Sequence, residues 1–129
     1  MGSDRISPRA RWVAYGDLRN PGNAVDGLIS TAAVSGSEYR GATITIDLGK
    51  TCMFNMVAVE HGSDALGYPR RMAILTSDDG QTFHLQMVVA GLPRVSSAVF
   101  VRPVLARYVR LRADTEGHRP WSVAEVFLN

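Results

Sequence analysis

The strongest constraint on the fold is the strict alternation of polar and apolar residues in short runs. Residues 43–48 alternate without a break, so Ile44, Ile46 and Leu48 lie on one face of a strand. Further runs of this kind cover residues 56–60, 72–76, 82–88, 98–101, 107–112 and 122–128. No segment keeps apolar residues at helical spacing for more than about two turns, so we expect no long amphipathic helix.

Turn signals separate these runs. Asp79-Gly80 lies between residues 72–76 and 82–88, and this dipeptide favours a tight turn joining two strands into a hairpin. Many short strands without helices predict an all-β fold, a two-sheet jelly-roll β-sandwich of about eight strands. Two long Gly- and Ser-containing stretches, residues 16–39 and 62–69, do not fit the strand pattern and are predicted loops.

The length favours one domain over residues 1–129, with residues 1–10 as a tag or flexible lead-in. Met1-Gly2-Ser3 resembles an expression scar. The net charge is +2, Lys50 is the single lysine and the arginines are scattered, so we expect no nucleic-acid partner. We find no signal peptide and no apolar run long enough for a transmembrane segment. Cys52 is the single cysteine, which excludes an intrachain disulfide.

Motifs for catalysis are missing from the sequence. It contains no Gly-x-Ser-x-Gly elbow, no phosphate-binding loop and no Gly-x-Gly-x-x-Gly fingerprint. The three histidines, His61, His84 and His118, are far apart, and no pair has the spacing of zinc ligands. We therefore expect a protein that is not an enzyme, although distant residues can assemble into a catalytic site that no local motif reveals.

Six short motifs occur in a familiar order. They are residues 23–27 followed by Thr31, then 46–49, 68–70, 77–83, 106–110 and 121–126. With these motifs the chain resembles the discoidin domain, also called the coagulation factor V/VIII (F5/8) type C domain, and its relatives among carbohydrate-binding modules. The resemblance runs from about Trp12 to Leu128 and implies a galactose-binding-domain-like sandwich. The motifs mainly specify turns and packing, so they identify the fold more than the ligand.

The resemblance also implies a structural calcium ion. Carried over by position, Asp26 and Thr31 in the Asp-Gly loop and Glu125 in the last strand would supply its oxygen ligands. The alternative is that Asp26 and Thr31 only stabilise a turn. One departure affects this loop, because the family usually has a tryptophan where this chain has Ala33. Trp12 or Tyr15 would then fill the space, or the loop packs differently.

The resemblance to sugar-binding relatives implies a ligand surface on loops at one end of the sandwich. Such a surface offers sugars an aromatic platform together with directional polar groups. The candidate ligand-binding residues are Tyr39, Arg40, His61, Asp64, Tyr68, His118 and Arg119. The alternative is ordinary loop surface, with Tyr68 anchoring its loop before Pro69. Trp121 begins the last strand and is expected in the core.

The resemblance implies a non-catalytic carbohydrate-binding module that binds a glycan or glycoconjugate. We expect it to be excised from a larger bacterial surface or glycan-processing protein, secreted, periplasmic or on the cell surface. Two alternatives stay open. One is an adhesion module that contacts proteins or lipids, for which Leu28, Ile29 and Leu66 are the obvious apolar spikes. The other is a structural accessory domain. The sequence leaves open which sugar is bound and whether the module dimerises.

Overall fold

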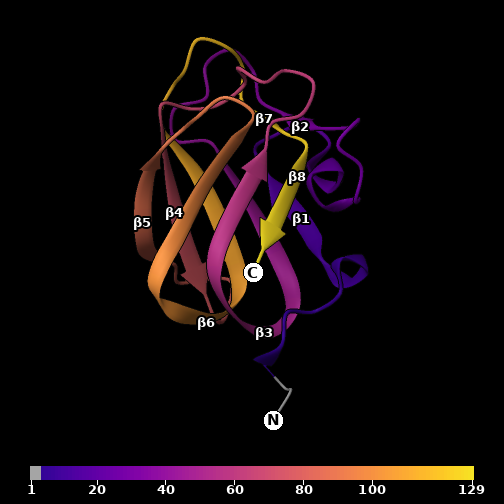
Figure 1. The fold of residues 1–129 in the computed structure, drawn as a ribbon, viewed down its shortest axis with the longest axis vertical. Coiled ribbons are helices and arrows are strands. Elements are labelled where there is room, and N and C mark those ends of the chain that lie inside the picture. Colours follow the sequence, from indigo (N-terminus) through magenta and orange to yellow (C-terminus); the bar gives the residue numbers. More distant parts are fainter. Residues whose placement is uncertain (1–3) are drawn as a thin grey trace.

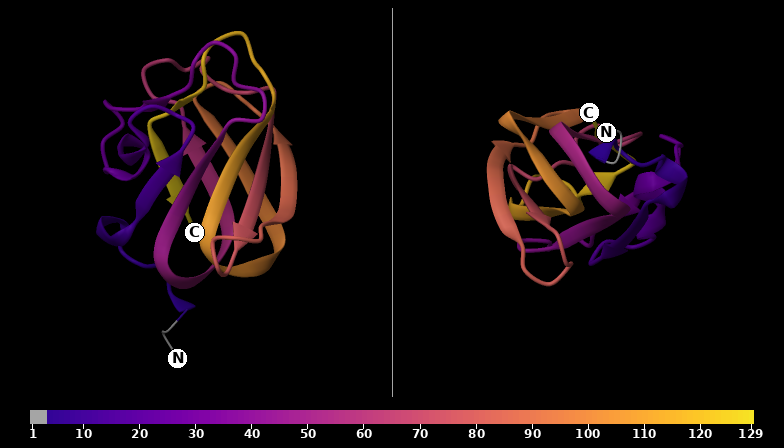
Figure 2. Two further views of the ribbon diagram at one scale, coloured as in Figure 1. Left: turned by 180° about the vertical axis from the view of Figure 1, so that it is seen from behind. Right: turned by 90° about the horizontal axis from the view of Figure 1, so that it is seen from below.

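The protein is a β-sandwich, as Figures 1 and 2 show from three directions. The computed structural model describes residues 4–129, so the scar predicted at Met1-Gly2-Ser3 lies outside the described residues. Within the described chain the strands are β1 Val13–Gly16, β2 Ala33–Val34, β3 Thr43–Glu60, β4 Arg71–Ser77, β5 His84–Ala90, β6 Val95–Thr115, β7 Ser122–Val123 and β8 Glu125–Leu128. Two short 3-10 helices, η2 (Arg9–Arg11) and η3 (Pro21–Val25), accompany them. The all-β sandwich with eight strands is confirmed.

Two long strands build both layers of the sandwich. The first half of β3 pairs with β1 and with the second half of β6, and β4 and β5 extend this layer. The second half of β3 pairs with β8 and with the first half of β6. The pairing of β3 with β6 shifts register between Asp47 and Cys52 and again between Phe54 and Met56. Such irregularities bend a strand, so one chain segment passes from one layer to the other.

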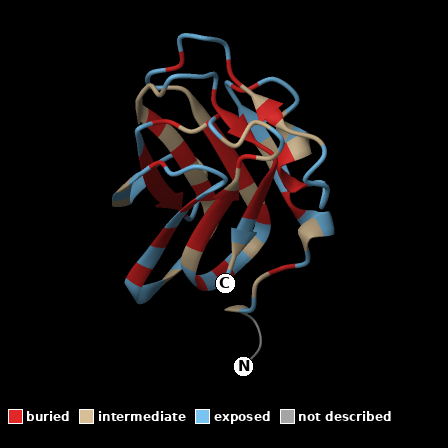
Figure 3. Ribbon diagram, turned by 45° about the horizontal axis from the view of Figure 1, so that its top comes forward, coloured by how far each residue is buried: buried red, intermediate tan, exposed pale blue. Residues whose placement is uncertain are grey.

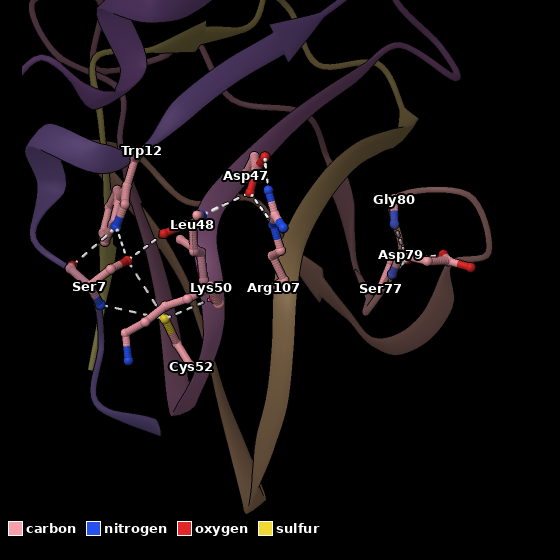
Figure 4. A network of polar contacts seen from close by, with 11 residues as sticks. Ser7, Trp12, Asp47, Leu48, Lys50, Cys52, Ser77, Asp79, Gly80 and Arg107 are labelled. Atoms are coloured by element: carbon pink, nitrogen blue, oxygen red, sulfur yellow. Dashed lines mark hydrogen bonds and ion pairs between the residues drawn. The ribbon is translucent and has the colours of Figure 1, made fainter. Parts of the chain in front are cut away.

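The predicted alternation is confirmed where it decides the core. Ile44, Ile46 and Leu48 are all fully buried, and so are Val109 and Leu111 on the partner strand. The hairpin is also confirmed, with Thr76 opposite His84. Its connection is longer than a two-residue turn. The Ser77 hydroxyl accepts hydrogen bonds from the Asp79 and Gly80 amides, as drawn in Figure 4.

The segment before β1 packs into the sandwich. Ser7 is buried, and its hydroxyl donates to the Leu48 carbonyl and accepts from the Trp12 indole N–H (Figure 4). Trp12 is also buried, whereas Tyr15 is exposed, so Trp12 is the aromatic of the two that joins the core. Part of the stretch predicted as a lead-in therefore contributes to the fold. Residues 4–129 contain no helix with the length and apolar character needed to cross a membrane.

The two ends of the sandwich differ in character. Figure 1 shows the N-terminal segment and the bends of β3 and β6 at the lower end. The connections that precede β3, join β3 to β4, join β5 to β6 and precede β7 lie at the upper end, which we call the loop end. Figure 3 shows these loops as mostly exposed above a buried core. All seven predicted ligand-binding residues belong to this end.

Candidate functional site at the loop end

Three loops are joined at the loop end by hydrogen bonds around Tyr39. The Gly117 amide donates to the Tyr39 hydroxyl at 2.6 Å, and that hydroxyl lies 3.5 Å from the Tyr68 carbonyl. Glu116 accepts hydrogen bonds from the backbone amides of Tyr39 and Arg40. The loop before β3, the loop before β4 and the loop before β7 are therefore held as one unit.

Tyr39 itself lies below the surface. Its side chain is 3% exposed and its ring packs 6.5 Å from the ring of Trp121, which is fully buried as the sequence predicts. Burial raises the pKa of the Tyr39 hydroxyl above its ordinary value, opposed by the hydrogen bond from Gly117. The structure thus gives Tyr39 a supporting position and leaves its ring without a face toward solvent.

His61 is buried in the same way. It is 0% exposed, and its Nδ1 lies 2.8 Å from the Ser122 carbonyl while its Nε2 lies 2.7 Å from the Ser96 hydroxyl. Because a carbonyl only accepts, Nδ1 carries the proton and Nε2 accepts from Ser96. Burial lowers the pKa of His61 below 6.5, so the neutral ring is favoured. Both ring nitrogens are engaged, which makes His61 a support for the loops.

Exposed polar groups lie above this buried layer. The Arg70 guanidinium contacts His118 Nε2 at 3.5 Å, and both side chains are exposed. Arg119 forms an ion pair with Asp64 at 3.5 Å, with about half of its side chain exposed. Tyr68 is half-buried, with its ring 6.0 Å from that of His61. These residues present hydrogen-bond donors and acceptors to solvent from two neighbouring loops.

A hollow of about 450 Å³ adjoins the site and is lined by Glu38, Arg40 and Glu116. Arg40 is exposed, as expected for a ligand-contacting residue. Among the predicted residues, the structure leaves Arg40, His118 and Arg119 exposed, and Asp64 is intermediate with 39% of its side chain exposed. Tyr39 and His61 are buried beneath them, and Tyr68 is intermediate.

Sequence reasoning missed two residues of this site. Arg70 belongs to the Tyr68-Pro69-Arg70 motif, so the motif itself was the available signal. No sequence signal pointed to Glu116, because its partners are the backbone amides of Tyr39 and Arg40, which lie 77 and 76 positions earlier in the chain.

The three residues of the predicted calcium site lie together. Neither His118 nor Arg70 is among their hydrogen-bond partners. The Thr31 hydroxyl and the Leu28 amide donate to the two oxygens of Asp26. The Gly27 amide donates to Glu125 Oε1 at 3.0 Å. Glu125 is 2% exposed, and burial raises its pKa while Arg9 opposes that shift.

A positive charge from the protein already faces this carboxylate. Arg9 pairs with Glu125 Oε2, and the same Nη1 donates to the Val126 carbonyl at 2.8 Å. The guanidinium also lies 4.6 Å from the ring centroid of Trp12 and 5.3 Å from that of Phe127. Every carboxylate oxygen of Asp26 and Glu125 thus accepts from an N–H or O–H donor. In this arrangement Glu125 is paired with Arg9, and the prediction that Asp26, Thr31 and Glu125 bind calcium stays a prediction.

The family match agrees with the fold and with the order of the motifs. Residues 6–126 match the F5/8 type C domain.

The chain belongs to the F5/8 type C domain family.

Several solved structures similar to this F5/8 type C domain are carbohydrate-binding modules. A family 32 module of NanJ from Clostridium perfringens, in complex with galactose, shares 19% identity at a TM-score of 0.81, covering 94% of this chain and 95% of that one. A module of Clostridium perfringens GH89, in complex with GalNAc-β-1,3-galactose, shares 22% identity at a TM-score of 0.77, covering 94% and 96%.

A longer protein also contains this fold. A GH29 fucosidase of Ruminococcus gnavus, in complex with fucose, shares 17% identity at a TM-score of 0.74, and the match covers 96% of this chain but 26% of that one. At these identities the likeness establishes the fold. No relative among curated proteins matches the sequence.

Proposed function

We propose that this F5/8 type C domain is a non-catalytic carbohydrate-binding module that holds its sugar at the loop end. The observation that carries the proposal is the group of exposed polar side chains Arg70, His118 and Arg119, with the partly exposed Asp64, on two loops fixed from below by buried hydrogen bonds. Sugars require directional donors and acceptors on a preformed surface. The galactose and GalNAc-galactose bound by structural neighbours support the same ligand class.

The mechanism is equilibrium binding without covalent chemistry. A shallow, exposed site buries little area, so we expect a Kd of about 0.1–10 mM for one sugar unit. A module of this kind gains avidity when a parent protein engages several sugars at once. We propose that such a parent processes glycans outside the cytoplasm. The fucosidase, in which the matched region is about a quarter of the chain, supports this arrangement.

The test is a glycan array with the purified domain, after its cooperative thermal unfolding has been measured. We expect binding to a defined sugar class, loss of that binding in His118→Ala, and retention in His84→Ala. His84 is the matched control because it is an exposed histidine at the start of β5, away from the loop end. A blank array from the folded protein would overturn the carbohydrate proposal.

Exposed apolar side chains favour a second candidate, an adhesion module that contacts lipid. Leu28, Ile29 and Leu66 are 54%, 60% and 49% exposed. Residues 28 and 29 also lie close to the loop before β4, since a Cβ placed on Gly62 would come 3.3 Å from the Ile29 carbonyl oxygen. Pelleting with phosphatidylserine vesicles tests this candidate. Pelleting that is lost when all three residues become serine supports it, and absence of pelleting excludes it.

A further inference from the structure

Among the described residues, no aromatic ring at the loop end is fully exposed for a sugar to stack on. Tyr39 and Trp121 are buried, and Tyr68 is half-buried beside His61. Two aromatic side chains of the described residues are classed as exposed, Tyr15 and Phe127, and they lie on strands β1 and β8. A neutral sugar at the loop end would therefore depend largely on hydrogen bonds, which must compete with water.

Arg70 is held on a rigid backbone with its guanidinium free to meet a ligand. Its amide donates to the Thr115 carbonyl at 3.0 Å and its carbonyl accepts from the Gly91 amide at 3.1 Å. The two loops pack so closely that a Cβ on Gly117 would overlap the Tyr68 carbonyl oxygen. This packing brings His118 beside Arg70. Glycine at position 117 thus allows the approach that places these two side chains next to each other.

The carboxylates near this pair are engaged elsewhere. Glu116 accepts the backbone amides of Tyr39 and Arg40, and Asp64 pairs with Arg119. Within residues 4–129, Arg70 has no ion pair, and its one side-chain hydrogen bond is with His118. Glu38 is exposed, and it lines the hollow together with Arg40 and Glu116. An exposed guanidinium next to an imidazole, without a carboxylate on it, suits an anionic group of a ligand.

We infer that the module selects acidic sugars, with Arg70 and His118 binding the carboxylate or sulfate group on the sugar ring. The inference rests on the proposed function and names its ligand class. Hydrogen bonds to a charged acceptor are about twice as strong as neutral ones, so charge compensates for the limited aromatic surface as a source of affinity. The planar fork of Arg70 matches a carboxylate in a way that lysine cannot.

Isothermal titration calorimetry tests the inference with galactose, galacturonate and galactose 6-sulfate. In the wild-type protein at low salt we expect galacturonate or galactose 6-sulfate to bind about tenfold more tightly than galactose. The preference should shrink in 0.5 M NaCl, because exposed charges are screened there. The two acidic probes separate a carboxylate-selective site from a sulfate-selective one.

Variants locate the preference. Arg70→Met is expected to reduce the affinity for the acidic sugar to that for galactose, and Arg70→Lys to retain only part of the preference. Arg102→Met is the matched control, because Arg102 is an exposed arginine in the bend of β6, away from the loop end. All variants are compared by thermal unfolding, so a folding defect is recognised directly.

Failure of the inference and failure of the proposed function are distinguishable. Equal affinity for galactose and both acidic sugars overturns the acidic-sugar inference and leaves the carbohydrate proposal standing. An acidic preference that persists in Arg70→Met overturns the role of this arginine. If none of the three sugars binds and the glycan array is blank, the proposed function itself fails.

Discussion

Arg9 and Arg70 have opposite surroundings in the same small domain. The guanidinium of Arg9 pairs with the buried Glu125 carboxylate and donates to the Val126 carbonyl, and it also lies near two aromatic rings. These contacts join the N-terminal segment to β8. Arg70 is exposed, and among the described residues its one side-chain hydrogen bond is with His118. The difference separates two uses of arginine. A guanidinium whose donors are satisfied inside the protein stabilises the fold, whereas one with free donors on a fixed backbone is available to a ligand.

The largest expected effect is a loss of stability when the Arg9–Glu125 pair is removed. Arg9→Met leaves the Glu125 carboxylate buried without its charge partner, which costs about 3 kcal/mol in the free energy of unfolding. Arg11→Met, at an exposed arginine of the same short helix, and Arg70→Met should each change it by less than about 0.5 kcal/mol. Denaturant unfolding measures all three variants.

A double-mutant cycle then isolates the pair. Adding Glu125→Gln to Arg9→Met removes the unpaired charge and should recover part of the lost stability. If Arg9→Met is as stable as Arg11→Met, the Arg9–Glu125 contact is not a structural ion pair.

The next effect concerns the buried layer beneath the loop end. The unfolded chain protonates His61 near the ordinary pKa of 6.5, and the folded protein does so at lower pH. Between those pKa values the unfolded chain binds more protons, so the free energy of unfolding falls as the pH decreases below 6.5. We expect this loss between pH 7.5 and pH 5.5 by denaturant unfolding.

Two variants assign that loss. His61→Asn should flatten the pH dependence in this range, although the variant starts from lower stability. His84→Asn, at an exposed histidine, should keep the pH dependence of the wild type. A His61→Asn protein with unchanged pH dependence would show that another group titrates.

The smallest expected effect is that of calcium. With Arg9 on Glu125, 5 mM CaCl₂ and 5 mM EDTA should give melting temperatures within about 1 °C of each other, since only a ligand that binds the folded state raises stability. A calcium ion at a hundred times its Kd would add about 2.7 kcal/mol and raise the midpoint by several degrees. Differential scanning fluorimetry separates these outcomes, and a rise of that size would mean that calcium displaces Arg9.

The fold was predictable where the pattern is local. The alternation at Ile44, Ile46 and Leu48 specifies the buried face without knowledge of any partner strand. The continuity of β3 and β6 was not predictable, because Gly49 and Pro103 interrupt the pattern at the bends and resemble strand ends. The last run was predicted as one strand, yet it divides at Ala124, because β7 pairs with β2 and β8 pairs with β3.

The site was predictable as a set of loops and less so as a set of surface residues. Loop position follows from the strands, but the buried Tyr39 and His61 are held by hydrogen bonds with Gly117 and Ser96, which are distant in sequence. The Arg9–Glu125 pair spans 116 positions and leaves no local signal. The sequence pattern therefore could not reveal the hydrogen bonds and ion pairs that join residues distant in the chain.

The central claim is that the ligand binds at the loop end, and an amide NMR titration with galactose and galacturonate tests it most directly. The account predicts that the perturbed backbone signals cluster in residues 38–41, 64–70 and 116–119, with little change around Arg9. Perturbations confined to the opposite end, at residues 49–53 and 101–105, or to the Arg9–Glu125 contact, would contradict it.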